Sequence, residues 1–243
     1  MNYSLNIVHL YSDLLNLYGD KGNIEALKRR LLWRNIDVNI IDVTASDNTI
    51  DFENADIIFL GGGSDREMES VSSLLLSHKE ALSSYIENGG VLLAICGGYQ
   101  LMGKYYKTKD NEIKGIEILD ITTVSDEKNR LIGDVILESE EFGKLTGFEN
   151  HGGRTEIGNH TPFGKVIVGH GNDGKSGSEG VIYKNLIGTY LHGPLLPKNP
   201  KLCDSLLEKA LKNKYADFAG LSPLDDTLEN KASDYIKTLF LKD

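Results

Sequence analysis

VLLAICGGYQLMG, residues 91–103, decides how this chain folds. Its first five residues are all apolar, which is typical of a strand buried on both faces of a parallel sheet. A cysteine, Cys96, comes directly after this strand, and two glycines and a helix-like stretch follow. A strand, a tight turn bearing a nucleophile and a helix together form a nucleophile elbow, here with cysteine in place of serine. The stretch therefore predicts a thiol presented at the edge of a parallel sheet.

The rest of the first hundred residues has the same texture of short apolar strands and amphipathic helices. Strands are predicted at residues 5–10, 38–43, 56–60 and 91–95. Apolar side chains at helical spacing predict helices around residues 23–35 and 68–87, with another beginning after Cys96. This alternation is typical of a mixed, mostly parallel central sheet with helices on both faces, a flavodoxin-like α/β fold.

The second half of the chain changes character. From about residue 112 to 191, short strand-like pieces separated by glycines predict a mixed or antiparallel extension of the sheet. Two helices, at 200–213 and about 226–241, are predicted to close the chain. Because no linker or repeat interrupts the sequence, we expect residues 1–243 to form a single domain with C-terminal helices from about residue 200.

Composition restricts the class of protein. The chain has 243 residues, 40% of them hydrophobic, and a net charge of −10, which argues against a nucleic-acid binder or an anionic-membrane binder. No apolar run approaches the ~20 residues of a membrane span, and the start lacks the features of a signal peptide. We therefore expect a cytoplasmic protein without membrane insertion, in which Cys96 and Cys203 are free thiols.

A catalytic thiol needs a base, and the sequence offers one. A cysteine beside two glycines could equally be a small buried residue at a tight packing position. Among the six histidines, however, His192 ends the strand-like segment LIGTYL and precedes Gly-Pro. Both residues would then lie at strand ends, where open parallel sheets carry their sites, and a thiolate–imidazole pair is the minimal unit for covalent acyl transfer.

The same elbow predicts where an oxyanion would be held. The backbone N–H of Gly97 follows the nucleophile directly, and the second donor of an elbow comes from an earlier strand–loop junction. GGGSDRE, residues 61–67, follows the third predicted strand and fits that role.

These residues carry a resemblance to class I glutamine amidotransferases, most closely to the cobyric acid synthase-like branch. The supporting segments lie between about residues 14 and 199. They are LNLYGDKGNIEAL, FLGGGSDRE, AICGGYQLMGKYY, NRLIGDV, GFENHGGRT and YKNLIGTYLHGPLLPKN. The resemblance implies a class I glutamine amidotransferase fold and a glutaminase that forms a thioester on Cys96, with His192 as base and proton donor. It also implies that Gly62 or Gly63 and Gly97 hold the oxyanion, and that Arg130 binds the α-carboxylate of L-glutamine, with Arg154 as the competing candidate.

One position departs from the wider family. Many class I amidotransferases carry H-P-E, in which the glutamate orients the histidine, whereas here Gly193 and Pro194 follow His192. Glu149 and Asp65 are alternative sources of the missing acid, and a dyad without an acid is the third possibility. If His192 is not the base, His151 is the next histidine to test.

The resemblance also implies partners. It is strongest to glutaminase subunits that form a heterodimer with a Mur-ligase-like synthetase subunit of the MurT type, which amidates the D-glutamate of the lipid II stem peptide. ATP and Mg²⁺ would then be bound by the partner, with no cofactor or metal in this chain, and the complex would act at the inner face of the cytoplasmic membrane. A subunit of another synthase, a stand-alone cysteine hydrolase acting on γ-glutamyl substrates and a non-enzymatic scaffold remain as alternatives.

A second motif points elsewhere. GHGNDGKS, residues 169–176, satisfies the P-loop pattern G-x-x-x-x-G-K-[ST] at every position. A P-loop holds phosphate at the N-terminus of a helix that starts at the lysine. Here GSEG and a new strand-like segment follow Ser176, so we expect no helix and no nucleotide site in this loop.

Overall fold

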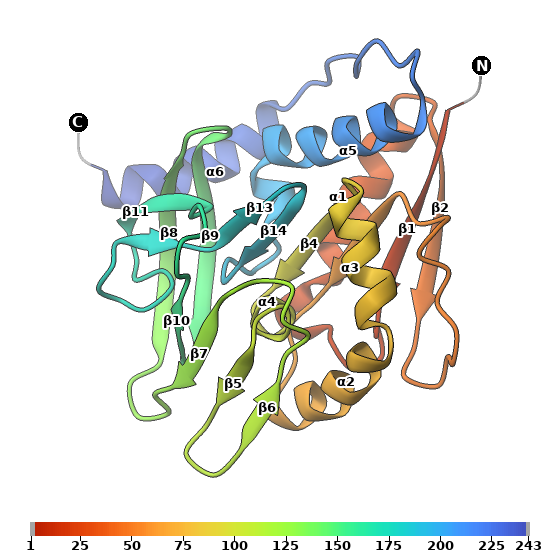
Figure 1. Ribbon diagram of the computed structural model, residues 1–243. Coiled ribbons are helices and arrows are strands. Elements are labelled where there is room, and N and C mark those ends of the chain that lie inside the picture. Colours follow the sequence, from red (N-terminus) through yellow and green to blue (C-terminus); the bar gives the residue numbers. More distant parts are fainter. Residues whose placement is uncertain (1–2, 242–243) are drawn as a thin grey trace.

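The computed structural model describes residues 3–241, which fold around a six-stranded central sheet (Figure 1). The strand order is β13-β14-β4-β3-β1-β2, and every neighbouring pair is parallel except β13 with β14. The strands are β1 (Ser4–Leu10), β2 (Asp37–Val43), β3 (Ile57–Leu60), β4 (Val91–Ile95), β13 (Val181–Tyr183) and β14 (Leu186–Thr189). All four strands predicted in the first hundred residues are confirmed, and β4 is fully buried along its length.

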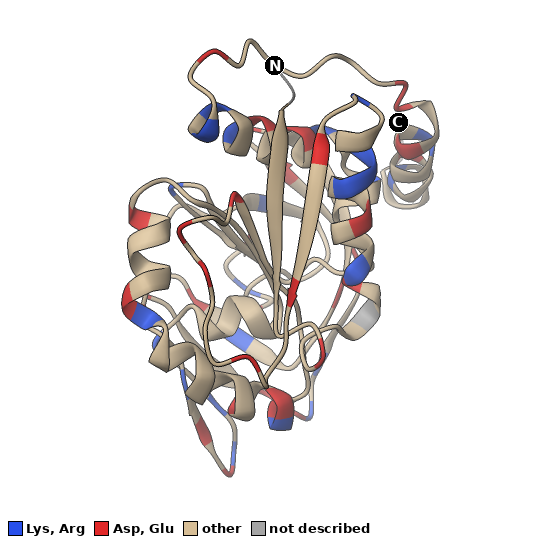
Figure 2. Cartoon of the chain, turned by 90° about the vertical axis from the view of Figure 1, so that its right-hand side faces the viewer, with Lys and Arg blue, Asp and Glu red and all other residues tan. Residues whose placement is uncertain are grey.

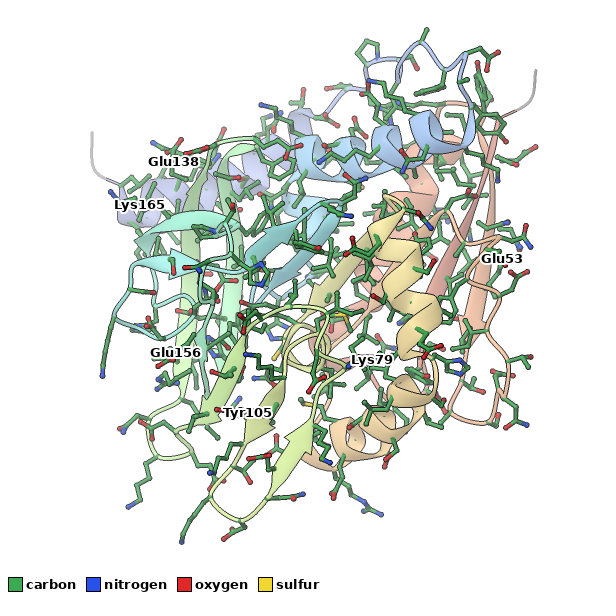
Figure 3. The ribbon with its side chains drawn as sticks, in the orientation of Figure 1. Glu53, Lys79, Tyr105, Glu138, Glu156 and Lys165 are labelled. Atoms are coloured by element: carbon green, nitrogen blue, oxygen red, sulfur yellow. The ribbon has the colours of Figure 1, made fainter. Side chains whose placement is uncertain are left out.

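Helices cover both faces of this sheet. α1 (Lys21–Leu32) and α5 (Pro200–Lys214) pack on one face, and α2 (Asp65–Ser77) and α3 (Lys79–Glu87) on the other (Figure 1). The prediction of one helix over residues 68–87 was wrong, because the helical backbone breaks at His78. Lys79, at the start of α3 (Figure 3), forms an ion pair with Glu117, which joins this helix to the segment between residues 114 and 122.

The segment from 112 to 191 extends the central sheet by β13 and β14 alone, which corrects the prediction. The other strands of this half, with β5, form two separate four-stranded sheets. One has the order β10-β7-β5-β6, with β5 (Tyr105–Lys107), β6 (Glu112–Lys114), β7 (Thr122–Ser125) and β10 (Gly153–Glu156). The other has the order β12-β11-β8-β9, with β8 (Leu131–Ser139), β9 (Gly143–His151), β11 (Gly164–Val168) and β12 (Ser178–Glu179). These sheets lie beside the carboxyl edge of the central sheet and supply further walls for a site there.

The C-terminal helices are as predicted, with α6 (Thr227–Phe240) following α5. Arg30 of α1 is buried and joins them, because its guanidinium donates to Asp204 of α5 at 2.6 Å and to Asp226, just before α6, at 2.6 Å. Elsewhere acidic and basic residues are interspersed over the surface (Figure 2). Within residues 3–241, no helix is both long and apolar enough to cross a membrane.

Candidate active site

Cys96 lies at a strained corner between β4 and α4 (Gly97–Leu101). Its backbone has φ 49° and ψ −104°, a conformation that costs a non-glycine residue on the order of 1–3 kcal/mol and is concentrated at functional sites. The Cys96 N–H donates to Thr189 O at 2.8 Å, which fixes the corner to strand β14. A Cβ on Gly98 would lie 2.5 Å from Leu60 O, so only glycine fits there. The predicted elbow geometry is therefore present, although its helix has only five residues.

His192 reaches the same corner from the neighbouring strand, β14. A Cβ placed on Gly62 would lie 3.3 Å from Cys96 Cβ and 3.5 Å from His192 Cε1, so the two side chains meet above this glycine. His192 is fully buried, and its backbone forms an isolated antiparallel bridge with Phe148 of β9. The structure thus brings together the cysteine and the histidine that the sequence singled out, across two adjacent strands.

The charge state of His192 follows from its neighbours. Burial disfavours the imidazolium, but the nearby negative charges of the Cys96 thiolate and Asp20 outweigh burial and raise the pKa of His192 to about 10. The raised pKa favours the imidazolium form of His192 at neutral pH.

Asp20 was missed at the sequence level. It lies between the short 3-10 helix η1 (Leu17–Gly19) and α1, and it is fully buried. Its Oδ1 is 3.8 Å from His192 Nδ1, and its Oδ2 accepts the Gly62 N–H at 2.8 Å. A signal was present in the sequence, since a lone aspartate in GDKGN stands between two glycines after the first strand, at the functional edge of the sheet.

The oxyanion donors can now be assigned more narrowly. The Gly62 N–H is used by Asp20, which leaves Gly63 as the candidate donor from this loop. A Cβ on Gly97 would lie 3.2 Å from Gly63 N, so these two residues face one another beside the nucleophile. The loop and the elbow are also bonded directly, because Gly98 N–H donates to Gly61 O at 3.1 Å. Gly63 and Gly97 therefore form the pair suited to an oxyanion.

A cavity of about 520 Å³ opens beside Cys96 and has Arg130 on its wall. Asn150 fixes the guanidinium of Arg130 by accepting from Nε at 3.1 Å and from Nη2 at 2.9 Å through its side-chain oxygen. Gln100, Tyr106 and His151 line the same cavity. A thiol at one end and a fixed guanidinium on the wall suit an amide substrate that carries a carboxylate.

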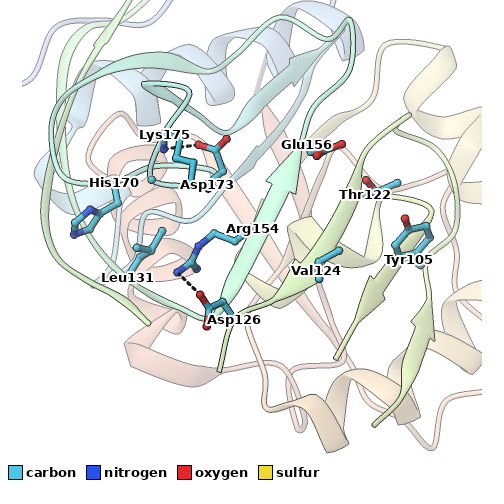
Figure 4. A pocket seen from close by; sticks show the side chains of 11 residues that line it. Tyr105, Thr122, Val124, Asp126, Leu131, Arg154, Glu156, His170, Asp173 and Lys175 are labelled. Carbon is cyan, nitrogen blue, oxygen red and sulfur yellow. Dashed lines mark hydrogen bonds and ion pairs between the residues drawn. The ribbon is translucent and has the colours of Figure 1, made fainter. Parts of the chain in front are cut away.

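Arg154, the competing candidate, lines a different cavity of about 590 Å³ (Figure 4). Its guanidinium donates to the carbonyls of Gly152, Gly153 and Asn129 and lies 3.9 Å from Asp126. Because Arg130 lines the cavity beside Cys96 and Arg154 lines another, the geometry favours Arg130 for the substrate.

The P-loop-like segment lies at this second cavity and does not have phosphate-binding geometry. No helix starts at Lys175, as predicted, since β12 begins at Ser178. The carboxylate of Asp173 accepts from the N–H groups of Lys175 and Ser176, each at 2.8 Å, so the loop's own acid occupies the position of an anion (Figure 4).

The alternative acids and the alternative base named from the sequence do not lie beside His192 in this way. Glu149 accepts the N–H groups of His170 and Gly171 at 2.8 and 2.9 Å, and it lies 3.7 Å from His151 rather than beside His192. Burial lowers the pKa of His151, which donates from Nδ1 to Gly153 O at 2.9 Å and stacks on Tyr190. Asp65 begins α2 at the wall of the Cys96 cavity and is exposed.

Two further residues of these types, Cys203 and His9, are buried in secondary structure elements. Cys203 is fully buried in α5, and His9 is buried in β1 beside Phe59. Within residues 3–241, no group of three or more His, Cys, Asp or Glu side chains is arranged to hold a metal ion.

Comparison with known proteins gives one family. The CobB/CobQ-like glutamine amidotransferase domain matches residues 6–200. The chain is 49% identical over 217 residues to the lipid II isoglutaminyl synthase (glutamine-hydrolyzing) subunit GatD of Staphylococcus aureus, covering 89% of this chain and 88% of that protein. The subunit of the same name from Streptococcus pneumoniae is 39% identical over 236 residues, with 96% and 90% covered. Cobyric acid synthase of Listeria innocua is 36% identical over 158 residues, which are 60% of this chain and 30% of that enzyme.

Solved structures show the same fold at low sequence identity. The structure of PurLQS from Thermotoga maritima matches with a TM-score of 0.55 at 14% identity, covering 88% of this chain and all of that one. The glutaminase domain of Trypanosoma brucei CTPS matches with a TM-score of 0.51 at 14% identity, covering 91% and 98%. The predicted fold class is therefore confirmed.

Proposed function

Since the chain belongs to the CobB/CobQ-like glutamine amidotransferase family and is a glutamine-hydrolysing enzyme subunit, we propose that it supplies ammonia to a lipid II isoglutaminyl synthase. The observation that carries the proposal is the match to two curated subunits of that synthase over most of both chains. The geometry around Cys96 supports the chemistry, and the relatives support the acceptor.

Substrate binding is assigned to the cavity beside Cys96. Arg130, held by Asn150, would bind the α-carboxylate of glutamine, and its Nη1 has no hydrogen-bond partner within residues 3–241. A charge-assisted hydrogen bond from Nη1 to the carboxylate would orient as well as attract the substrate. The side-chain amide would then point toward the thiol.

The first chemical step is attack by Cys96. The thiolate sulfur forms a bond to the side-chain amide carbon of glutamine, and the carbonyl electron pair moves to oxygen, where the Gly63 and Gly97 N–H groups stabilise it. As the carbon–nitrogen bond breaks, the imidazolium of His192 gives its proton to the leaving nitrogen. The products of this step are ammonia and a γ-glutamyl thioester on Cys96.

The second step regenerates the thiol. His192, now neutral, takes a proton from a water molecule, whose oxygen attacks the thioester carbon. The thiolate leaves, and glutamate is released with the amide nitrogen replaced by oxygen. This sequence consumes one water per glutamine and needs no nucleotide at the Cys96 site.

The ammonia requires an activated acceptor, because forming an amide from a carboxylate in water is unfavourable without phosphorylation. We assign that activation to a Mur-ligase-like synthetase subunit that binds ATP and Mg²⁺ and amidates the D-glutamate of lipid II to D-isoglutamine. A heterodimer would limit loss and protonation of ammonia in solvent if the Cys96 cavity faced the partner. Its lipid substrate would bring the complex to the inner face of the cytoplasmic membrane.

Reconstitution tests the proposal. The purified chain and the synthetase subunit are incubated with lipid II, ATP, Mg²⁺ and glutamine labelled with ¹⁵N in its side-chain amide, and lipid II is analysed by mass spectrometry. The expected product carries one ¹⁵N amide. Labelled product from the synthetase alone, or no increase in product when this chain is added, would contradict the proposal.

A matched control separates hydrolysis from assembly. With Cys96→Ala in place of the native chain, labelled glutamine should give no product, whereas ammonium chloride should still be used by the synthetase. Equal product from labelled glutamine with the variant would remove Cys96 from the reaction.

A further inference from the structure

We propose that Asp20 is the positioning residue of the Cys96–His192 pair, replacing from a distant part of the chain the acid that H-P-E would supply. The inference rests on the proposed glutaminase activity. It concerns how His192 is oriented and kept charged, and it turns the predicted dyad into a triad whose third member comes from the loop before α1.

The two side chains meet in a fully buried environment. Asp20 and His192 are both 0% exposed, and Oδ1 lies 3.8 Å from Nδ1. Catalytic hydrogen bonds are often long before substrate binds, so this separation is compatible with an acid–imidazole contact. The other oxygen, Oδ2, accepts the Gly62 N–H at 2.8 Å, which fixes the direction of the carboxylate.

The segment around Asp20 is built against the segment around His192. A Cβ on Gly22 would lie 2.5 Å from Pro194 Cγ, so the first turn of α1 packs directly on the chain just after the histidine. Asn23 is buried and its side-chain oxygen accepts the Leu196 N–H at 2.9 Å. The segment 20–23 is therefore fixed against residues 192–196 through Gly22 and Asn23, and against the loop at Gly62 through Asp20. These contacts hold the Asp20 carboxylate facing the imidazole.

The chemistry of the pair follows from this register. A carboxylate facing Nδ1 keeps a proton on that nitrogen and leaves Nε2 to exchange a proton with the thiol and the substrate. The charged groups that face His192 are Cys96 from the elbow and Asp20 from the loop before α1. From the 3-10 helix η2 (Leu196–Lys198), Lys198 Nζ would lie 3.8 Å from a Cβ on Gly193. Asp20 is thus the carboxylate that faces the His192 imidazolium, in agreement with the raised pKa of His192.

The chain contains a second aspartate–histidine pair, with an exposed aspartate, that serves as a control. His9 of β1 is also buried, and its Nδ1 lies 3.4 Å from the carboxylate of Asp42 on β2. Asp42→Asn removes an aspartate beside a buried histidine in the same sheet without touching the Cys96 cavity. Its activity and pH profile should match those of the native chain.

The kinetic test is Asp20→Asn, which keeps an oxygen that can accept the Gly62 N–H and removes the charge. We expect kcat for glutamine hydrolysis to fall about 10- to 1,000-fold, with KM changed less than about threefold. The alkaline limb of the kcat profile should move to lower pH, because the imidazolium loses its counter-charge. A kcat within about twofold of the native value, a loss confined to KM, or an unmoved alkaline limb would overturn the proposal.

A measurement without glutamine keeps the inference separate from the proposed function. In the native protein, ¹⁵N NMR of the His192 ring should show Nδ1 protonated throughout and titration well above the ordinary range for histidine. Asp20→Asn should lower that titration midpoint, whereas Asp42→Asn should not. Ordinary titration of His192 in the native protein, or an unprotonated Nδ1, would overturn the role of Asp20 even if the chain hydrolyses glutamine. The expected NMR result with no glutaminase activity would count against the proposed function instead.

Discussion

Gly22 and Pro194 are packed so closely that a single added methyl group on the glycine would overlap the proline ring. This contact joins the start of α1 to the chain that follows His192. Gly22→Ala should therefore lower stability by about 1–3 kcal/mol, because overpacking must displace one of the two segments. It should also lower kcat by shifting His192. Thermal unfolding and glutamine hydrolysis measure the two effects, with Arg29→Ala, an exposed change in the same helix, as control. Unchanged stability and kcat would show that the contact is not constraining.

Replacement of the two cysteines should have opposite consequences. Cys96→Ala should abolish glutamine hydrolysis and preserve the fold, since alanine is small enough for the corner. Cys203→Ala should keep activity but reduce the melting temperature, because Cys203 is fully buried in α5 and its removal leaves a small void. Ammonia release and circular dichroism melts test both variants. Hydrolysis by Cys96→Ala at a rate near that of the native chain would exclude the thiol as nucleophile.

Loss of the imidazole should affect turnover much more than binding. His192→Ala removes the base and proton donor together, and such losses typically cost ~10²–10⁴-fold in rate. Glutamine affinity, measured by calorimetry in a Cys96→Ala background, should change little. A loss of less than about fivefold would move the acid–base role to another group, with His151 on the same cavity as the next variant.

The two arginines should be separable by substrate dependence. Arg130→Ala should raise KM for glutamine with a smaller change in kcat, because a carboxylate contact stabilises the bound substrate and the transition state alike. Arg154→Ala is the matched control, since its guanidinium binds backbone carbonyls at a different cavity. If KM rose for Arg154→Ala and not for Arg130→Ala, the assignment of the carboxylate site would be reversed.

A buried acid should give stability a pH dependence of known sign. Burial raises the pKa of Glu179 to about 7, although Thr189 and the Tyr190 N–H donate to its Oε1. The folded state therefore holds this proton over a range where the unfolded chain has released it, and stability falls as pH rises from about 4.5 to 7. Glu179→Gln should raise the melting temperature relative to the native chain by several degrees more at pH 8 than at pH 5. A difference that is equal at both pH values would contradict the assignment.

Local signals explain which parts of the site could be predicted from sequence. Cys96 and His192 each follow an apolar strand, so strand pattern alone placed them at one edge of the sheet. Asp20 could not be found that way, because its contact with His192 depends on how α1 packs on Pro194, more than 170 residues away in the chain. Arg130 and Arg154 could not be separated either, since only tertiary structure shows which guanidinium lies on the wall of the Cys96 cavity.

The fold, like the site, could be predicted only in part from the sequence. The parallel strands were predicted because burial on both faces leaves continuous apolar runs. Residues 115–119, GIEIL, are one of the strand-like pieces of the second half but form no strand, and the strands from 122 to 179 pair in two separate sheets. Pairing partners of short antiparallel strands depend on contacts distant in sequence, which alternation of apolar residues does not encode.

The bridge between Phe148 and His192 gives β9 a mechanical role. His192 donates its N–H to Phe148 O at 2.6 Å, and two residues further along the same strand Asn150 holds the guanidinium of Arg130. His192, which acts at the reacting end of glutamine, and Arg130, which is assigned to its carboxylate, are thus both held by β9. A displacement of the paired strands β8 and β9 would move His192 and Arg130 together. The spacing between the groups that contact the two ends of the substrate is therefore set by one strand.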